Sequence, residues 1–116
     1  MNFEFILTSD FEKSVKRLNK KYSSFKNDLS EFLKSLRENP FQGDILIPGV
    51  RKIRLQIKSK GKGKSGGARV ITYTVVISEL EGQIYLLDIY DKNDSESVDH
   101  EILKKMVFDL ENGNNN

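Results

Sequence analysis

Hydrophobic residues recur along this chain with two different periods, and each period predicts a different kind of element. Phe3, Phe5 and Leu7 fall on one side of an extended N-terminal stretch, which is typical of a strand with one buried face. Three further β runs follow in the second half of the chain, and a tight Glu81-Gly82 turn joins the last two. The predicted strands span residues 2–7, 50–58, 68–78 and 83–92.

Apolar residues three and four positions apart predict helices that bury one side. The first helix begins with a capping box, in which Ser9 is the N-cap and Glu12 reaches back to it. Asn39-Pro40 ends the second helix, because the proline ring disfavours helical geometry in the residue before it. The predicted helices span residues 10–21, 24–37 and 97–110.

The remaining segments are predicted loops, and the order of elements predicts the fold class. Residues 39–49 carry two prolines and two glycines, and residues 59–67 form a glycine-rich basic hairpin loop that is too polar to be buried. The order β-α-α-β-β-β-α predicts an α+β domain, with an antiparallel twisted sheet, an N-terminal helical hairpin and a C-terminal helix. A chain of 116 residues suffices for one domain, predicted for residues 1–111, with residues 112–116 as a flexible tail.

Composition excludes several classes of protein. No apolar run approaches the 20 or so residues that a membrane helix needs, and the N-terminal stretch lacks the features of a secretory signal. The absence of cysteine excludes disulfides, thiolate metal sites and cysteine nucleophiles, and a single histidine argues against a zinc site. We therefore expect a cytoplasmic protein that works without a metal or cofactor.

Charge is distributed unevenly, although the net charge is only +2. Residues 45–78 contain eight basic side chains and no acidic one, whereas residues 79–116 contain three basic and ten acidic ones. A block of that sign and density favours binding to a polyanion, of which nucleic acid is the commonest in a cytoplasm. The alternative is a solvated lysine loop, or one that pairs with the acidic C-terminal third.

The strand at residues 50–58 carries the clearest pattern. Ile53, Leu55 and Ile57 must face the core. The residues that alternate with them form a ladder, mostly of cations, on the other face: Lys52, Arg54, Gln56 and Lys58. Successive cations lie about 6–7 Å apart, close to the spacing of phosphates along an extended strand of nucleic acid. Lysines can also mark a solvated edge strand. Arg69, which opens the next strand, can grip a phosphate bidentately or pack on its neighbour.

Other side chains, inside and beyond this basic block, are candidates for RNA contacts or for proton transfer. Tyr73 can stack on a base, and Tyr90, at the end of the last strand, can donate a phenolic proton. Histidine is the residue type whose unperturbed pKa lies near neutrality, so His100 is a possible general acid or base, although a lone helical histidine is more often an exposed surface residue. The predicted RNA-binding residues are Lys58, Lys60, Lys62, Lys64 and Tyr73. The glycine-rich loop lacks the spacing of a nucleotide-binding loop, and no helix follows it.

Three stretches together resemble a known family. The segments KIRL (residues 52–55), GKGKSGGARVITY (residues 61–73) and LLDIYDKN (residues 86–93) are similar to the RelE/ParE superfamily of type II toxins, and most to the HigB-like RelE toxins. The resemblance implies an mRNA interferase that cuts translated mRNA in the ribosomal A site. In that reaction the 2′-OH attacks the adjacent phosphate, giving a 2′,3′-cyclic phosphate and a free 5′-OH without a metal.

The resemblance also implies roles for individual residues and partners. Arg69 matches the arginine at the scissile phosphate, Lys52 and Arg54 match cations of the RNA groove, and Lys92 is the basic end of the last strand. Family members pair with a cognate antitoxin, often a helix-turn-helix protein, which wraps the toxin and binds operator DNA with it.

Two positions depart from the family pattern. Asn93 stands where some members have a further arginine, and the C-terminal tyrosine that serves as general base has no match near Ser97. Tyr90 or His100 can take its place. Two alternatives therefore stay open, a ParE-like inhibitor of DNA gyrase and a toxin that binds RNA without cutting it.

Overall fold

The computed structural model describes residues 2–94 and 98–113, and within them it has the predicted α+β class. Its elements are β1 (Asn2–Leu7), α1 (Ser9–Lys21), α2 (Phe25–Glu38), β2 (Asp44–Ile47), β3 (Val50–Leu55), two short 3₁₀ turns named η1 (Lys58–Lys60) and η2 (Lys64–Gly66), β4 (Ala68–Val76), β5 (Glu81–Asp91) and α3 (His100–Glu111). No helix in these two ranges is long and apolar enough to cross a membrane. The prediction that the last helix covers residues 98 and 99 is wrong, because Asp99 is the N-cap of α3. Residue 97 and the tail residues 114–116 lie outside the described residues.

The sheet is mixed, so the prediction of an antiparallel sheet is wrong in one respect. The strand order is β1-β5-β4-β3-β2, and β1 runs parallel to β5, from Asn2 opposite Glu81 to Leu7 opposite Leu86. The other neighbours are antiparallel. Hydrophobic alternation gives the buried face of a strand but not the direction of its partner.

The loop predicted for residues 39–49 is also wrong in part, because Asp44–Ile47 pairs with β3 as an edge strand.

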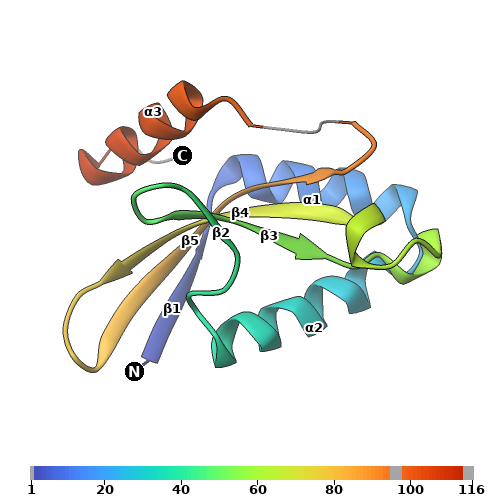
Figure 1. The fold of residues 1–116 in the computed structure, drawn as a ribbon, viewed down its shortest axis with the longest axis horizontal. Helices are drawn as coiled ribbons and strands as arrows, with labels where there is room; N and C mark the ends of the chain where they lie inside the picture. The colour runs from blue at the N-terminus through green and yellow to red at the C-terminus, as the bar shows by residue number, and fades with distance from the viewer. Residues whose placement is uncertain (1, 95–97, 114–116) are drawn as a thin grey trace.

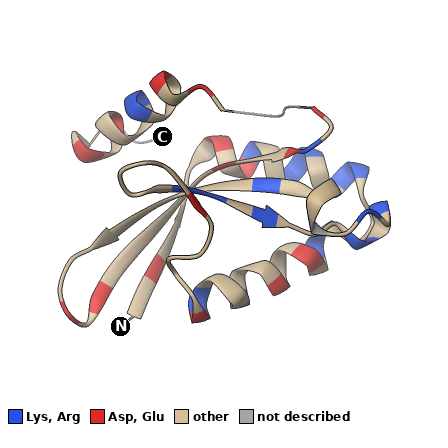
Figure 2. Cartoon of the chain, viewed as in Figure 1, with Lys and Arg blue, Asp and Glu red and all other residues tan. Residues whose placement is uncertain are grey.

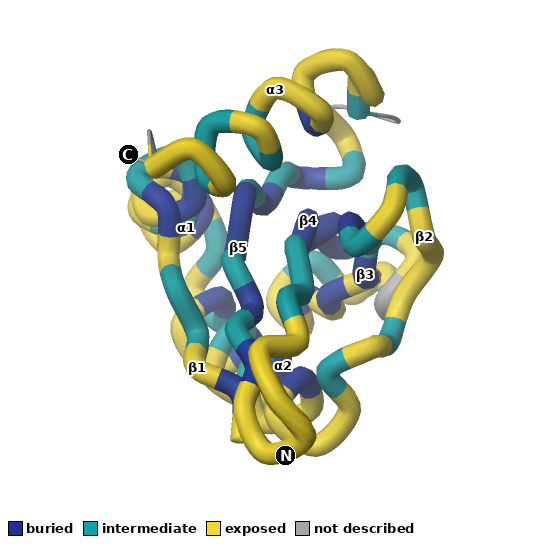
Figure 3. The backbone as a smooth tube through the Cα atoms, turned by 90° about the vertical axis from the view of Figure 1, so that its left-hand side faces the viewer, coloured by how far each residue is buried: buried dark blue, intermediate teal, exposed yellow. Residues whose placement is uncertain are grey.

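Helices cover both faces of the sheet and create two hydrophobic cores. On one face, Phe11 of α1 and Phe25 of α2 pack with inward residues of the strands such as Leu86. On the other face, Leu103 of α3 packs over Ile71 and neighbouring residues. Figure 1 shows α3 and α2 on opposite sides of the sheet, and Figure 3 shows buried backbone concentrated in the central strands.

A β-bulge in β5 decides which side chains share a face. Ile71 lies opposite Asp88 while Thr72 lies opposite Leu86, so Leu87 is an extra residue in β5. Ile84, Leu86 and Ile89 therefore all belong to the α1/α2 core, and Tyr90 faces the α3 side. Without the bulge, strict alternation from Leu86 would have turned Tyr90 to the opposite face.

The N-terminus of α1 is anchored at this bulge, and the prediction of Ser9 as its N-cap is wrong. Thr8 is the N-cap, and its hydroxyl accepts a hydrogen bond from the Phe11 amide at 3.2 Å. The same hydroxyl lies 3.0 Å from the carbonyl oxygens of both Leu86 and Leu87, where it can donate. Thr8 is favoured over its neighbour because its buried oxygen satisfies groups on two elements.

Candidate nucleic-acid interface

Three predicted site residues form a row across the sheet. Arg54 of β3 lies directly opposite Arg69 of β4, and Arg69 lies directly opposite Tyr90 of β5. Directly opposed residues have Cβ atoms about 5 Å apart. Strand alternation turns the Cβ atoms of all three toward the α3 side of the sheet, since Val70 and Leu55 beside them belong to the other core. Arg54, near the edge of the sheet, also lines a pocket with Glu31 and Phe32 of α2. We call Arg54, Arg69 and Tyr90 the central row.

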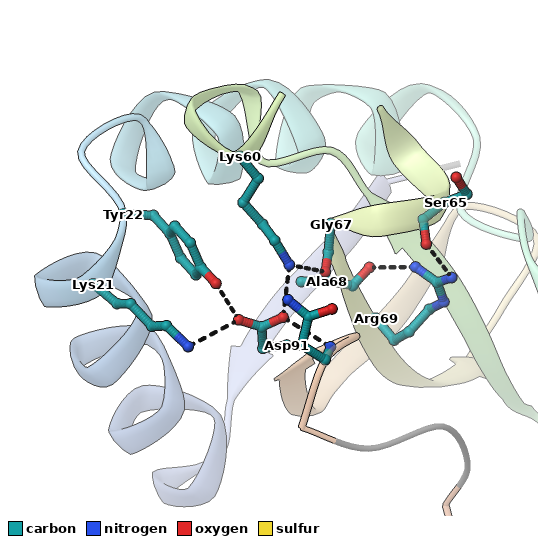
Figure 4. Close-up of polar contacts among 9 residues, drawn as sticks. Lys21, Tyr22, Lys60, Ser65, Gly67, Ala68, Arg69 and Asp91 are labelled. Atoms are coloured by element: carbon teal, nitrogen blue, oxygen red, sulfur yellow. Dashed lines mark hydrogen bonds and ion pairs between the residues drawn. The ribbon is translucent and has the colours of Figure 1, made fainter. Parts of the chain in front are cut away.

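Arg69 is an almost fully buried cation, with 5% of its surface exposed. Its guanidinium donates hydrogen bonds to the carbonyl oxygens of Ser65 at 2.9 Å and Ala68 at 3.1 Å, as Figure 4 shows. Both carbonyls belong to the loop and strand immediately before it, so the local chain fixes the plane of the guanidinium. A fixed guanidinium plane is what bidentate binding of a phosphate requires.

Two arginines placed opposite each other on neighbouring strands repel. Arg54 is exposed and Arg69 is buried, so the two cations differ in their access to water. An anion bound between the two guanidinium groups would turn this repulsion into attraction. The central row is therefore a candidate anion site.

Tyr90 contributes a hydroxyl that is buried without a hydrogen-bond partner among the described residues. Burial raises the pKa of its phenol, and the neighbouring Arg69 lowers it by less. The phenol is therefore protonated at neutral pH and has a proton to donate. A buried, unsatisfied donor beside a cationic pair is unfavourable in an empty site and favourable next to a bound oxyanion.

Two further predicted residues border the central row. Lys52 precedes Arg54 by two residues on the same face of β3 and lies opposite Ile71. Lys92 follows the end of β5, and its amide donates to the Gly67 carbonyl at 3.0 Å, which places it beside the start of β4. The structure thus brings the predicted catalytic residues to one end of the sheet.

The lysines predicted to bind RNA have different surroundings. Lys58 is exposed and pairs with the exposed Glu31 at 3.0 Å. Lys62 is exposed on the loop. The ammonium of Lys60 is buried and bonds to Asp91 at 2.7 Å, so the expectation that this loop is too polar to be buried is wrong for Lys60. The side chain of Lys64 lies outside the part of the chain that the structure describes.

Neither Tyr73 nor His100 lies beside the central row. Tyr73 stacks on Tyr85 with ring centroids 6.0 Å apart, and its hydroxyl donates to Glu111 at 3.0 Å. That environment is a contact with the C-terminal end of α3. His100 is exposed at the first position of α3 and is not opposed to any residue of the row. Their predicted roles stay predictions.

A second basic surface escaped the sequence analysis. The outer side of α1 carries five cations that line one shallow groove: Lys13, Lys16, Arg17, Lys20 and Lys21. Within the N-terminal third of the chain basic and acidic residues nearly balance, which concealed this face. The signal that reveals it is helical spacing, because cations three and four residues apart share one side of a helix. Figure 2 shows basic residues of α1 and of the loop toward one end of the molecule, and those of β3 and β4 extending from the centre of the sheet toward that end.

These residues hold no evident metal centre. Among residues 2–94 and 98–113, no three histidine or carboxylate side chains are grouped so that they could bind a metal ion. The chemistry available is that of guanidinium, ammonium and phenol groups, which suits a phosphate ester. No model of a known protein family matches the chain.

Proposed function

We propose that this protein is the toxin of a type II toxin–antitoxin pair, an endoribonuclease that cleaves mRNA on the ribosome. The central row carries the proposal, because it joins a cation pair suited to a phosphate with a protonated phenol. The substrate, mRNA on the ribosome, is inferred from the resemblance of residues 52–55, 61–73 and 86–93 to RelE toxins. Neither argument needs a metal or a cofactor.

The proposed reaction is transesterification within the RNA chain. The 2′ oxygen forms a bond to phosphorus, the bond from phosphorus to the 5′ oxygen breaks, and the products are a 2′,3′-cyclic phosphate and a 5′-OH. Arg69 and Arg54 stabilise the negative charge that accumulates on the phosphoryl oxygens. Tyr90 donates the proton that the departing 5′ oxygen requires. The proton of the attacking 2′-OH passes to solvent water, and solvent later returns a proton to the Tyr90 oxygen. Lys52 and Lys92 hold neighbouring phosphates.

A cognate antitoxin of the helix-turn-helix type would silence such a site and carry the complex to operator DNA. Carboxylates placed over Lys52, Arg54 and Arg69 would form charge-assisted hydrogen bonds in the place of phosphate. The cation pair is then stabilised by the antitoxin instead of RNA.

Expression from a tight promoter, followed by mapping of 5′ ends across cellular mRNA, tests the proposal. New 5′-OH ends within translated codons would support it. Intact mRNA with arrested growth, DNA damage and filamentation would replace it with gyrase inhibition. Intact mRNA with normal growth would leave a protein that at most binds RNA.

Tyr90→Phe separates the chemical role of the phenol from its packing. The ring keeps its place, and removing a buried hydroxyl that lacks a partner leaves thermal stability equal or slightly higher. Cleavage should fall by roughly a hundredfold or more, the range for loss of a general acid. Melting curves and a primer-extension time course measure the two effects. Unchanged cleavage by the folded variant would remove Tyr90 from the mechanism.

The cations of α1 should add to RNA affinity without taking part in cleavage chemistry. Lys16→Gln with Lys20→Gln removes two of them, and the salt dependence of binding should weaken by about 1–2 units of slope. Lys26→Gln with Lys34→Gln is the matched control, because both are exposed lysines of α2. Fluorescence anisotropy of labelled RNA at several salt concentrations gives the slopes. Equal slopes for both double variants would show that α1 makes no specific contribution.

A further inference from the structure

Asp91 ends β5 with a carboxylate that receives hydrogen bonds from several parts of the chain. Oδ1 accepts from the Lys60 ammonium at 2.7 Å and from the Asn93 amide at 3.0 Å. Oδ2 accepts from the Tyr22 hydroxyl and from the Lys21 ammonium at 3.4 Å. The side chain of Asp91 is 0% exposed and that of Lys60 is 5% exposed. This is an enclosed ion pair, unlike the surface pairs elsewhere in the described chain.

Lys60 connects this carboxylate to the loop of residues 58–67. Its ammonium also lies 3.5 Å from the Gly67 carbonyl oxygen, which accepts the Lys92 amide as well. Gly67 packs so closely on β3 that a Cβ there would lie 2.1 Å from the Leu55 carbonyl oxygen. The end of the loop is therefore held in one position.

The start of the loop is held from the helical hairpin. The Ser59 amide donates to the Ser24 hydroxyl at 2.8 Å, and the Lys58 amide donates to Asp28 at 3.1 Å. Between these two anchored ends lies Ser65, whose carbonyl oxygen accepts from Arg69. Figure 4 shows the Asp91 contacts and the Arg69 contacts on either side of Gly67 and Ala68.

We propose that the Lys60–Asp91 ion pair positions Arg69 for its phosphate. The pair holds the loop in the shape in which the Ser65 carbonyl fixes the guanidinium plane. The inference rests on the proposed function, because it concerns how that site holds RNA. Lys60 and Asp91 are thereby positioning residues that do not touch RNA.

The substitution Asp91→Asn tests this assignment, because the two explanations predict opposite changes in RNA affinity. Electrostatics alone predicts tighter RNA binding, since the substitution removes a negative charge near a polyanion site. Loss of positioning predicts weaker binding instead. Asp94→Asn is the matched control: it makes the same substitution at an exposed aspartate three residues along, so its effect is that of the charge alone.

Two readouts are taken on the same proteins. The first is the affinity for a short, fluorescein-labelled, single-stranded RNA whose 2′-O-methyl groups prevent cleavage. The second is the NMR spectrum of the Arg69 guanidinium, which does not depend on RNA. Asp91→Asn should bind about tenfold more weakly, the effect of one charge-assisted contact, while Asp94→Asn should bind equally or more tightly. Resolved guanidinium N–H signals of the wild type should average in Asp91→Asn.

A double variant distinguishes loss of Arg69 positioning from loss of folding. The amides of Lys60→Gln with Asp91→Asn can hydrogen-bond each other, so this protein should recover affinity and guanidinium signals relative to Asp91→Asn. If folded Asp91→Asn binds RNA as tightly as Asp94→Asn and keeps its signals, the positioning role is overturned. If the wild type binds no RNA, the proposed function fails, and the guanidinium signals alone decide whether the pair orients Arg69.

Discussion

Arg69→Ala should abolish cleavage of translated mRNA and the growth arrest that accompanies it. Loss of one preorganised donor to a developing oxyanion lowers the rate by roughly 10²–10³-fold. Here the loss also removes the buried half of a cation pair, so we expect the upper end of that range. Mapping of 5′ ends after induction measures the effect. Arg69→Lys keeps the positive charge but lacks the planar guanidinium that donates two parallel hydrogen bonds to a phosphate. It should therefore restore only a small part of the activity.

Arg37→Ala is the matched control for this substitution. Arg37 is an exposed arginine at the end of α2, where it stacks on Phe5 with 4.4 Å from guanidinium to ring centroid. It lies on the helical hairpin and belongs to no part of the central row, so cleavage should persist. Full cleavage by folded Arg69→Ala would show that the phosphate binds elsewhere.

Asp91→Ala should have the largest effect on stability. It leaves the Lys60 ammonium buried without its counter-ion, and breaking a buried pair in this way costs about 3–5 kcal/mol of unfolding free energy. Lys58→Ala breaks an ion pair whose side chains are 57% and 62% exposed, and it should change stability by less than about 1 kcal/mol. Urea unfolding of the two variants makes the comparison. Similar losses in both would contradict the role of burial.

The same carboxylate gives stability a dependence on pH. Burial by itself would raise the pKa of Asp91, but hydrogen bonds from Lys60, Tyr22 and the Asn93 amide hold it below its ordinary value. Its contribution is therefore present above the unfolded-state pKa of about 3.9 and is lost as the pH falls below it. Urea midpoints at decreasing pH should fall more steeply for the wild type than for Asp91→Ala. Parallel curves would mean that Asp91 is not the group responsible.

Much of the fold follows from patterns that involve neighbouring residues. The alternation in β3 predicts that Ile53 and Leu55 face the core, and both are buried. The helical spacing predicts α1 and α2 to within a residue at each end. These predictions succeed because period and burial are local properties of a strand or helix. The parallel pairing of β1 with β5 is not local, and the prediction of an antiparallel sheet missed it.

The candidate site shows the same division. The order of residue types already predicts a run of cations without acids, an arginine at the start of a strand and a tyrosine near the end of another. The alignment of Arg54, Arg69 and Tyr90 in one row could not be predicted in this way, because strand register and the bulge at Leu87 set which face Tyr90 occupies. The structure also decided that Lys60 is buried against Asp91, 31 residues away in the chain. The charge of a side chain follows from its residue type, but its ion-pair partner and its exposure depend on packing between distant parts of the chain.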